Sequence, residues 1–209
     1  MPGGLLRPGS LAPVRTLDPL LGPPVAVPDP DRLIHLQFRR FAGCPVCHLH
    51  LRSVVRRHEE IEAAGIREVV VFHSPPGELR PHLEGLPFPV VADPDKLLYT
   101  AFGVESMPRA LLSPRAWGPM ARAVLLGTWG MLRGREKPPV LRPNGGRLGL
   151  PADFLIGSDG RIVAAKYGEH VDDQWAVDEL LALASAATAG TAATVGGSGA
   201  PGDPVLREV

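Results

Sequence analysis

The chain has 209 residues, and its 22 Lys and Arg balance 22 Asp and Glu, so the formal net charge is zero. This balance argues against nucleic acid as the main partner, because nucleic-acid-binding domains carry a basic face. No apolar run reaches the roughly 18 residues needed to span a bilayer. The first residues also lack the basic stretch and uninterrupted apolar core of a secretory signal. We therefore expect a cytoplasmic protein without a membrane span.

The N-terminal part of the chain is rich in proline. Residues 1–31 contain eight of the 24 prolines, and proline has no amide hydrogen to donate to a sheet ladder. We expect residues 1–11 to be a flexible N-terminus that leads into one domain over residues 12–187. A short hairpin strand near residues 25–27 fits this stretch.

A buried strand over residues 32–38 and a helix over residues 45–64 follow. The apolar side chains of the second segment recur near i, i+4, i+7 and i+8, which is typical of a helix with one face on a core. Gly65 ends this pattern, as expected of the residue that follows a helix.

Further along, the pattern predicts a β-branched central strand at residues 68–72, a loop with a short helix at 74–85, a short strand at 88–92 and a helix at 93–102. An irregular insertion follows at 105–149. The chain then forms a hairpin of 153–156 with 161–165 and ends in a last helix capped by Asp172 and Asp173. Within the insertion, the apolar residues 117–132 could form a helix, which we expect to be a lid over the core, although it could also bind a membrane surface or a partner. Residues 188–209 are dominated by Ala, Gly, Thr and Ser and predict a disordered tail.

The two cysteines are the most informative residues. Cys44 and Cys47 are the only cysteines in the chain, and a C-x-x-C between a strand and a helix is typical of a thioredoxin-like redox site. At a helix N-terminus, unpaired N–H groups and the macrodipole stabilise a thiolate. Pro45 suits the first helical position. We therefore predict an α/β, thioredoxin-like fold, with a central mixed sheet flanked by helices and an insertion before the C-terminal hairpin.

Several segments resemble the peroxiredoxin-like branch of the AhpC/TSA family, over roughly residues 12–185. They are Phe38-Arg-Arg-Phe-Ala-Gly-Cys-Pro-Val-Cys47, Val69-Val-Val-Phe-His-Ser74, Ala92-Asp-Pro-Asp-Lys96 and Leu150-Pro-Ala-Asp-Phe-Leu-Ile156. The resemblance implies a thioredoxin-like fold and an antioxidant or thiol-disulfide oxidoreductase activity.

The sequence departs from that family at the peroxide-binding motif. Peroxiredoxins carry P-x-x-x-T-x-x-C around the attacking cysteine, whereas Phe41 stands here at the threonine position and Gln37 at the proline position. Pro151 stands in the neighbourhood of the expected peroxidase arginine, and Arg147 is the nearest substitute. By its resemblance to thioredoxin-type reductases, Pro151 is expected to be a cis proline that faces the cysteine pair.

Other roles for the same residues remain open. The cysteines could be an inert pair, half of a zinc site with His48 or His50, or part of a C-x-x-C-H haem attachment site. Arg39 and Arg40 could stabilise a thiolate, but strand alternation directs at most one of them toward the cysteines. We expect His48 and His50 to lie on the helix surface, with His48 as a candidate proton acceptor for Cys44.

The favoured hypothesis is a thiol-dependent antioxidant oxidoreductase that needs no metal or organic cofactor. Cys44 is the expected exposed nucleophile, and Cys47 resolves the mixed disulfide or sulfenic acid. Arg39, Arg40, Pro45 and Pro151 are expected to support them. The substrate is a disulfide or a hydroperoxide, and an external thiol is the reductant. The alternative hypothesis is a non-enzymatic redox-sensing or interaction module. The sequence leaves the oligomeric state open.

Overall fold

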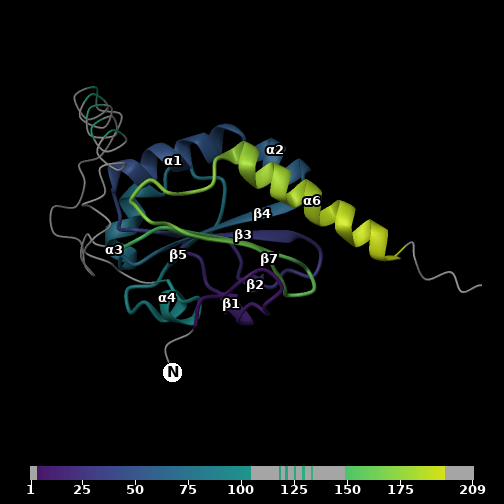
Figure 1. The fold of residues 1–209 in the computed structure, drawn as a ribbon. Helices are drawn as coiled ribbons and strands as arrows, with labels where there is room; N and C mark the ends of the chain where they lie inside the picture. The colour runs from purple at the N-terminus through teal and green to yellow at the C-terminus, as the bar shows by residue number, and fades with distance from the viewer. Residues whose placement is uncertain are drawn as a thin grey trace, which may run out of the picture.

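The fold is a central sheet with helices on one face and a small hairpin and a helix on the other (Figure 1). A computed structural model describes residues 4–104 and 149–195, together with the single positions 118, 121, 125, 129 and 133. Five strands form the central sheet in the order β5-β4-β3-β6-β7. Their bounds are β3 Leu33–Arg39, β4 Ile66–Phe72, β5 Val90–Ala92, β6 Ala152–Ile156 and β7 Ile162–Tyr167.

The sheet is mixed. Strand β3 pairs in parallel with β4 and antiparallel with β6. Strand β4 pairs in parallel with β5, and β6 pairs antiparallel with β7 through the turn at residues 157–160. The parallel strands β3, β4 and β5 therefore end at the same edge of the sheet, where the chain leaves β3 toward the cysteines. This arrangement confirms the predicted α/β, thioredoxin-like fold.

Two apolar layers cover the sheet. On one face, Ile34, Leu36 and Phe38 of β3 pack with the hairpin β1 (Arg15–Leu17) and β2 (Val25–Val27) and with α4 (Leu97–Ala101). On the other face lie α1 (Pro45–Arg56), α2 (His58–Ala63) and α6 (Val177–Val195) (Figure 1). Strand alternation sends the neighbours of the first set toward these helices. Those neighbours are His35, Gln37 and Arg39, and all three are buried.

The helix expected over residues 45–64 is divided in two. It breaks at Arg57, which has φ −116° and ψ 19°, so α1 and α2 are separate helices. Beyond β4 the chain forms α3 (Pro76–Leu79) and a 3₁₀ turn, η1 (Arg80–His82). Leu79 is fully buried and anchors this segment beside the end of the sheet.

Two helices begin later than the sequence predicts, because Asp93 caps its helix from four residues upstream and Asp173 is engaged outside its helix. The Asp93 carboxylate accepts the N–H groups of Leu97 and Leu98 at 2.9 and 2.8 Å, so α4 starts at Leu97 and not at Asp93. Asp173 pairs with Lys166 at 3.1 Å and accepts the N–H of Glu169. It therefore does not cap α6.

Both ends of the described chain are more ordered than expected. The N–H of Gly9 donates to the Ile162 carbonyl and that of Ala12 to the Gly160 carbonyl, each at 2.8 Å. These bonds dock the stretch before β1 against β7, in contrast to the flexible segment expected at residues 1–11. Helix α6 continues to Val195, so residues 188–195 are helical and not part of a disordered tail. No helix of the described residues is both long and apolar enough to cross a bilayer.

Candidate active site

Cys44 and Cys47 lie where β3 gives way to α1. Gly43 has φ 71°, a left-handed conformation that glycine adopts without strain, and turns the chain into the helix. Cys44 is the N-cap of α1, and Pro45 takes the first helical position, where a missing amide hydrogen costs nothing. The N–H of His48 donates to the Cys44 carbonyl at 2.9 Å. The helix therefore places Cys47 almost one turn beyond Cys44.

The environment of Cys44 favours its thiolate. Its pKa is lowered to about 6, mainly by a hydrogen bond from the side chain of Cys47. Burial opposes this shift, but the positive charge of Arg40 and the backbone N–H groups of Cys47 and Val46 support it. Nη1 of Arg40 lies 3.8 Å from the Cys44 sulfur. Cys44 is therefore mostly ionised at neutral pH.

Cys47 is held in the opposite state. Its pKa is raised well above the ordinary value, because its proton is engaged in the hydrogen bond to Cys44 and because the thiol is buried beside that negative charge. Both thiols are free. The pair therefore consists of one thiolate and one thiol, which is the ionisation state that suits a nucleophile and a second cysteine held in reserve.

The expectation of an exposed Cys44 is wrong. Its side chain is only 2% exposed, because it packs in a small apolar cluster with Phe41, Val46, Cys47 and Val171. Phe41 itself is buried, and the guanidinium of Arg40 lies over its ring, 5.4 Å from the centroid. The position that carries a hydroxyl in peroxiredoxins is thus an apolar wall behind the thiolate.

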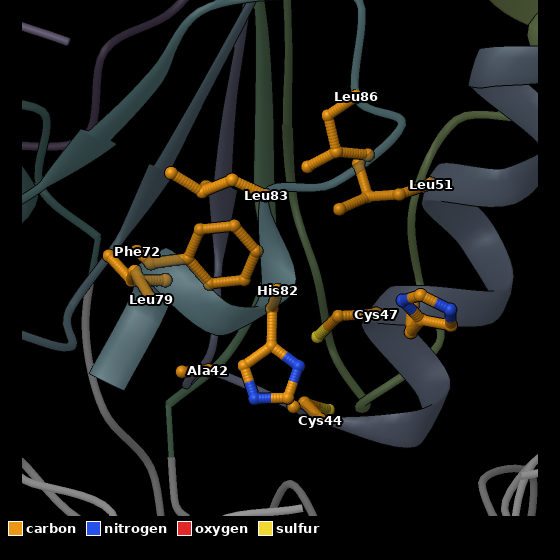
Figure 2. A pocket seen from close by; sticks show the side chains of 11 residues that line it. Ala42, Cys44, Cys47, Leu51, Phe72, Leu79, His82, Leu83 and Leu86 are labelled. Atoms are coloured by element: carbon orange, nitrogen blue, oxygen red, sulfur yellow. The ribbon is translucent and has the colours of Figure 1, made fainter. Parts of the chain in front are cut away.

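A small pocket reaches both sulfur atoms (Figure 2). One wall is the start of α1, and the facing wall comes from α3, η1 and the residues that follow. The volume open to a solvent-sized sphere is about 20 Å³, which is room for about one water-sized group. The lining residues are Ala42, Gly43, Cys44, Cys47, His48, Leu51, Phe72, Leu79, His82, Leu83 and Leu86. The described lining is therefore mostly apolar, and its polar side chains besides the cysteines are two histidines.

Arg39 and Arg40 lie in different environments. Arg40 contacts Cys44, whereas Arg39 is completely buried on the helix-facing side of the sheet. Nη2 of Arg39 donates to the Asp153 carboxylate at 2.8 Å and approaches Nε2 of His50 at 3.2 Å. Arg39 therefore supports the site only indirectly, by tying β3 to β6 and to α1.

The Arg39–Asp153 pair belongs to a larger buried polar network. Nδ1 of His35 lies 2.9 Å from Glu68, and Nε2 of His35 lies 3.4 Å from Asp153. Gln37 donates to Glu68 and accepts from Arg39. Burial alone would lower the pKa of His35, but the charges of Glu68 and Asp153 and their hydrogen bonds raise it to about 9. Two cations thus face two carboxylates in the core.

The sequence predicts a plain buried strand at β3, and this network is an additional feature of the folded chain. A signal was present, because His35, Gln37 and Arg39 alternate with three apolar residues, and period-two polarity indicates one polar face. Glu68 and Asp153 each stand directly before an apolar run within a strand. His50, expected on the helix surface, is only partly exposed, and its Nε2 lies 3.2 Å from Nη2 of Arg39. Desolvation, reinforced by that charge, lowers the pKa of His50 to about 3.

The expectation of a cis proline at position 151 is also wrong. The only cis peptide bond among the described residues joins Val27 and Pro28. Pro151 instead packs against Gly168, whose N–H donates to the Pro151 carbonyl at 2.9 Å. A Cβ at Gly168 would lie 2.8 Å from Cγ of Pro151. This close approach of two backbones fixes the start of β6.

The insertion lies almost entirely outside the described residues, and with it Arg147 and the expected lid at 117–132. The chain is described again from Gly149. A Cβ at Gly149 would lie 3.1 Å from Nε2 of His73 and 3.9 Å from Cγ of Arg40. The chain therefore enters β6 in contact with the arginine beside Cys44. Among the described residues, no three His, Cys, Asp or Glu side chains are grouped as ligands of a metal ion.

Solved structures resemble this chain in fold. Peroxidoxin BcpB from Mycobacterium tuberculosis is 16% identical with a TM-score of 0.60, covering 87% of this chain and 97% of that one. AhpC from Mycobacterium tuberculosis is also 16% identical, with a TM-score of 0.61 and coverage of 90% and 96%. A Chlorobium tepidum protein described as thiol:disulfide interchange protein DsbE is 20% identical, with a TM-score of 0.55 and coverage of 86% and 99%. No curated protein matches this chain.

The fold and the ionised cysteine beside a thiol define the class as thioredoxin-like thiol proteins. The model of the AhpC/TSA antioxidant enzyme family matches residues 53–170, which is more than half of the chain. The chain therefore belongs to the AhpC/TSA family and is a thiol-dependent oxidoreductase. The matched segment begins after Cys47, so the role of the cysteine pair has to be argued from its geometry.

Proposed function

We propose that the protein is a thiol-disulfide oxidoreductase in which Cys44 is the nucleophile and Cys47 the resolving cysteine. The Cys44 thiolate, with a pKa of about 6 and Arg40 at 3.8 Å, is the observation that carries this proposal. The thiolate attacks one sulfur of a substrate disulfide and forms a mixed disulfide. Cys47 then loses its proton and attacks the Cys44 sulfur, which releases the second thiol and leaves Cys44–Cys47 oxidised. An external thiol reduces the pair again.

We propose that a disulfide is a better substrate than a hydroperoxide. Reduction of a peroxide develops charge on the departing oxygen, and donors aimed at that charge lower the barrier. Phe41 offers no hydroxyl where peroxiredoxins have a threonine, and its ring is buried beside Cys44. Arg40 is the one guanidinium that contacts the Cys44 sulfur among the described residues. The thiolate that leaves a disulfide has a lower pKa than the hydroxide or alkoxide that leaves a peroxide, so attack on a disulfide depends less on such donors.

The test is a steady-state assay with hydrogen peroxide, an alkyl hydroperoxide and a model disulfide, with Cys44→Ser as control. We expect the disulfide to be turned over fastest, and all activity to be lost in Cys44→Ser. Faster reduction of either peroxide, with Cys44 essential, would show that the protein is a peroxidase. A single oxidation of the pair without turnover would favour a redox sensor.

We also propose that the protein works in the cytoplasm. Thiols there keep a C-x-x-C pair reduced, and such pairs are catalytic more often than structural in that compartment. A reporter of the cysteine redox state in intact cells would test this, and a pair that is fully oxidised at steady state would argue for another compartment.

A further inference from the structure

The pocket beside the cysteines joins two elements from different parts of the chain. Cys44, Cys47 and Leu51 come from the start of α1, and Leu79, His82 and Leu83 come from α3, η1 and the residue after it. Both walls follow strands that end at the same edge of the sheet, β3 and β4. The Ala42 N–H donates to the Ser74 hydroxyl at 3.0 Å and ties the two strand exits together. Figure 2 shows the His82 ring directed toward the Cys44 side of this pocket.

The geometry of η1 holds His82 in place. The η1 turn follows directly after Leu79, which is 1% exposed and belongs to the core beneath α1. The Leu83 N–H donates to the Arg80 carbonyl at 3.4 Å, and the Leu86 N–H donates to the Leu83 carbonyl at 3.1 Å. Because the pocket is only large enough for about one water-sized group, a substrate atom that reaches the Cys44 sulfur also reaches the His82 side of the lining.

The proposed reaction is helped by a proton donor in this pocket, close to the sulfur that leaves the substrate. Attack by Cys44 expels a thiolate, which leaves faster when it is protonated or when its own pKa is low. Arg40 stabilises the attacking thiolate but does not give up a proton near neutral pH. Apart from the cysteines, the described residues of the lining that carry an exchangeable side-chain proton are His48 and His82. Imidazole is the side chain whose ordinary pKa suits proton transfer at this pH.

We propose that His82 is a catalytic general acid that protonates the departing thiolate. This inference rests on the proposed thiol-disulfide exchange. In the first step, the Cys44 thiolate forms a bond to one substrate sulfur, the S–S bond breaks, and the second sulfur takes a proton from His82. The neutral imidazole then accepts the proton of Cys47. In the second step, Cys47 attacks Cys44, and His82 returns that proton to the second thiol. Two substrate thiols are released, and the two electrons that reduce the substrate disulfide come from Cys44 and Cys47, which are oxidised to a disulfide.

The test compares leaving groups in single-turnover reactions of the reduced protein. One substrate is bis(2-hydroxyethyl) disulfide, whose alkyl thiol needs a proton to leave. The other is an aromatic disulfide, whose thiolate leaves without one. We expect His82→Gln to slow the alkyl reaction by roughly 100-fold, the usual scale of general acid catalysis, and to leave the aromatic reaction within about threefold. The matched control is His58→Gln on α2, outside the pocket, which should leave both rates unchanged.

The pH profile gives a second measurement. The wild-type alkyl reaction should decline at alkaline pH as the imidazole loses its proton, and His82→Gln should lack that decline. Equal slowing of both substrates would mean a structural role and would overturn the proposal, as would loss of only the alkyl reaction in His48→Gln. If wild-type protein reacts with both disulfides no faster than a free thiol, the proposed function fails and the role of His82 fails with it.

Discussion

The guanidinium of Arg39 donates to the carboxylate of Asp153 at 2.8 Å, and neither side chain is exposed to solvent. The two residues come from adjacent strands, β3 and β6, and His50 of α1 lies 3.2 Å from the same guanidinium nitrogen. Breaking a buried pair leaves a charge that water cannot reach, and this usually costs more than the intact pair contributes. The pair therefore fixes the end of β3, one residue before Arg40.

We predict that Arg39→Met will destabilise the protein by about 3 kcal/mol, the lower end of the range for one partner lost from a buried pair. Asp153 would keep His35 at 3.4 Å and the N–H of Trp175 at 3.1 Å, but no longer the guanidinium. The measurement is urea unfolding of the reduced protein. The control is Arg57→Met, which breaks an exposed pair with Glu60 and Asp178 and should cost much less, because exposed ion pairs contribute little to stability. Similar losses in the two variants would contradict the prediction.

The protonated state of His35 predicts a dependence of stability on pH. The pKa of His35 is raised from 6.5 to about 9 in the folded protein. Between these values the folded state binds the proton and the unfolded state does not, so the free energy of unfolding falls as pH rises from 6.5 through 9. The full contribution of protonated His35 to the free energy of unfolding is present below pH 6.5 and is at most on the order of 3 kcal/mol.

This measurement needs a parent protein without titrating thiols. The lowered pKa of Cys44 makes the free energy of unfolding of the reduced protein increase as pH rises through the same interval, which would mask the fall caused by His35. Cys44→Ser/Cys47→Ser serves as the parent. Adding His35→Gln should flatten the fall between pH 6.5 and 9. A parent whose stability is flat across that interval would show that His35 has no raised pKa.

We predict that the reactivity of Cys44 depends on Cys47 more than on Arg40. The hydrogen bond from Cys47 is the largest cause of the lowered pKa of Cys44, and the charge of Arg40 comes after it. The pH at which alkylation of Cys44 is half-maximal should therefore rise further in Cys47→Ala than in Arg40→Met. Cys47→Ser is the matched control, since its hydroxyl can still donate to the thiolate. A larger shift in Arg40→Met would reverse this order.

We predict that Gly168→Ala will destabilise the protein by about 1–3 kcal/mol, the usual cost of overpacking. The added Cβ would lie 2.8 Å from the Asp173 carbonyl and 2.9 Å from the Pro151 carbonyl, and backbone cannot move aside as a side chain can. Gly77→Ala in α3 is the control, because nothing lies within 4 Å of its Cβ. Thermal unfolding of the two variants gives the comparison, and equal midpoints would refute the packing argument.

The order of elements and the place of the cysteines were predictable from the sequence, because apolar periodicity and the C-x-x-C motif are local signals. Strand β4 and the hairpin of β6 and β7 are confirmed with ends shifted by one or two residues. The state of each thiol was less predictable, since the burial of Cys44 depends on Val171, far away in the chain.

The two late helix starts could not be predicted for a similar reason. Asp93 and Asp173 are both good capping residues by type. Only the folded chain shows that the Asp93 carboxylate reaches forward to Leu97 and Leu98, and that Asp173 is drawn to Lys166. The buried network was hidden because its members come from three strands and a helix, and single-sequence patterns do not reveal which strands are neighbours.

The contact between Gly149 and Arg40 also bears on how this enzyme could be altered by design or by evolution. Position 149 leads into β6, whereas Arg40 sets the charge beside the reactive sulfur. A side chain at position 149 would press on the His73 ring and approach Arg40. Substitution of Gly149 is thus a route to moving that charge, and with it substrate preference, while the scaffold is retained.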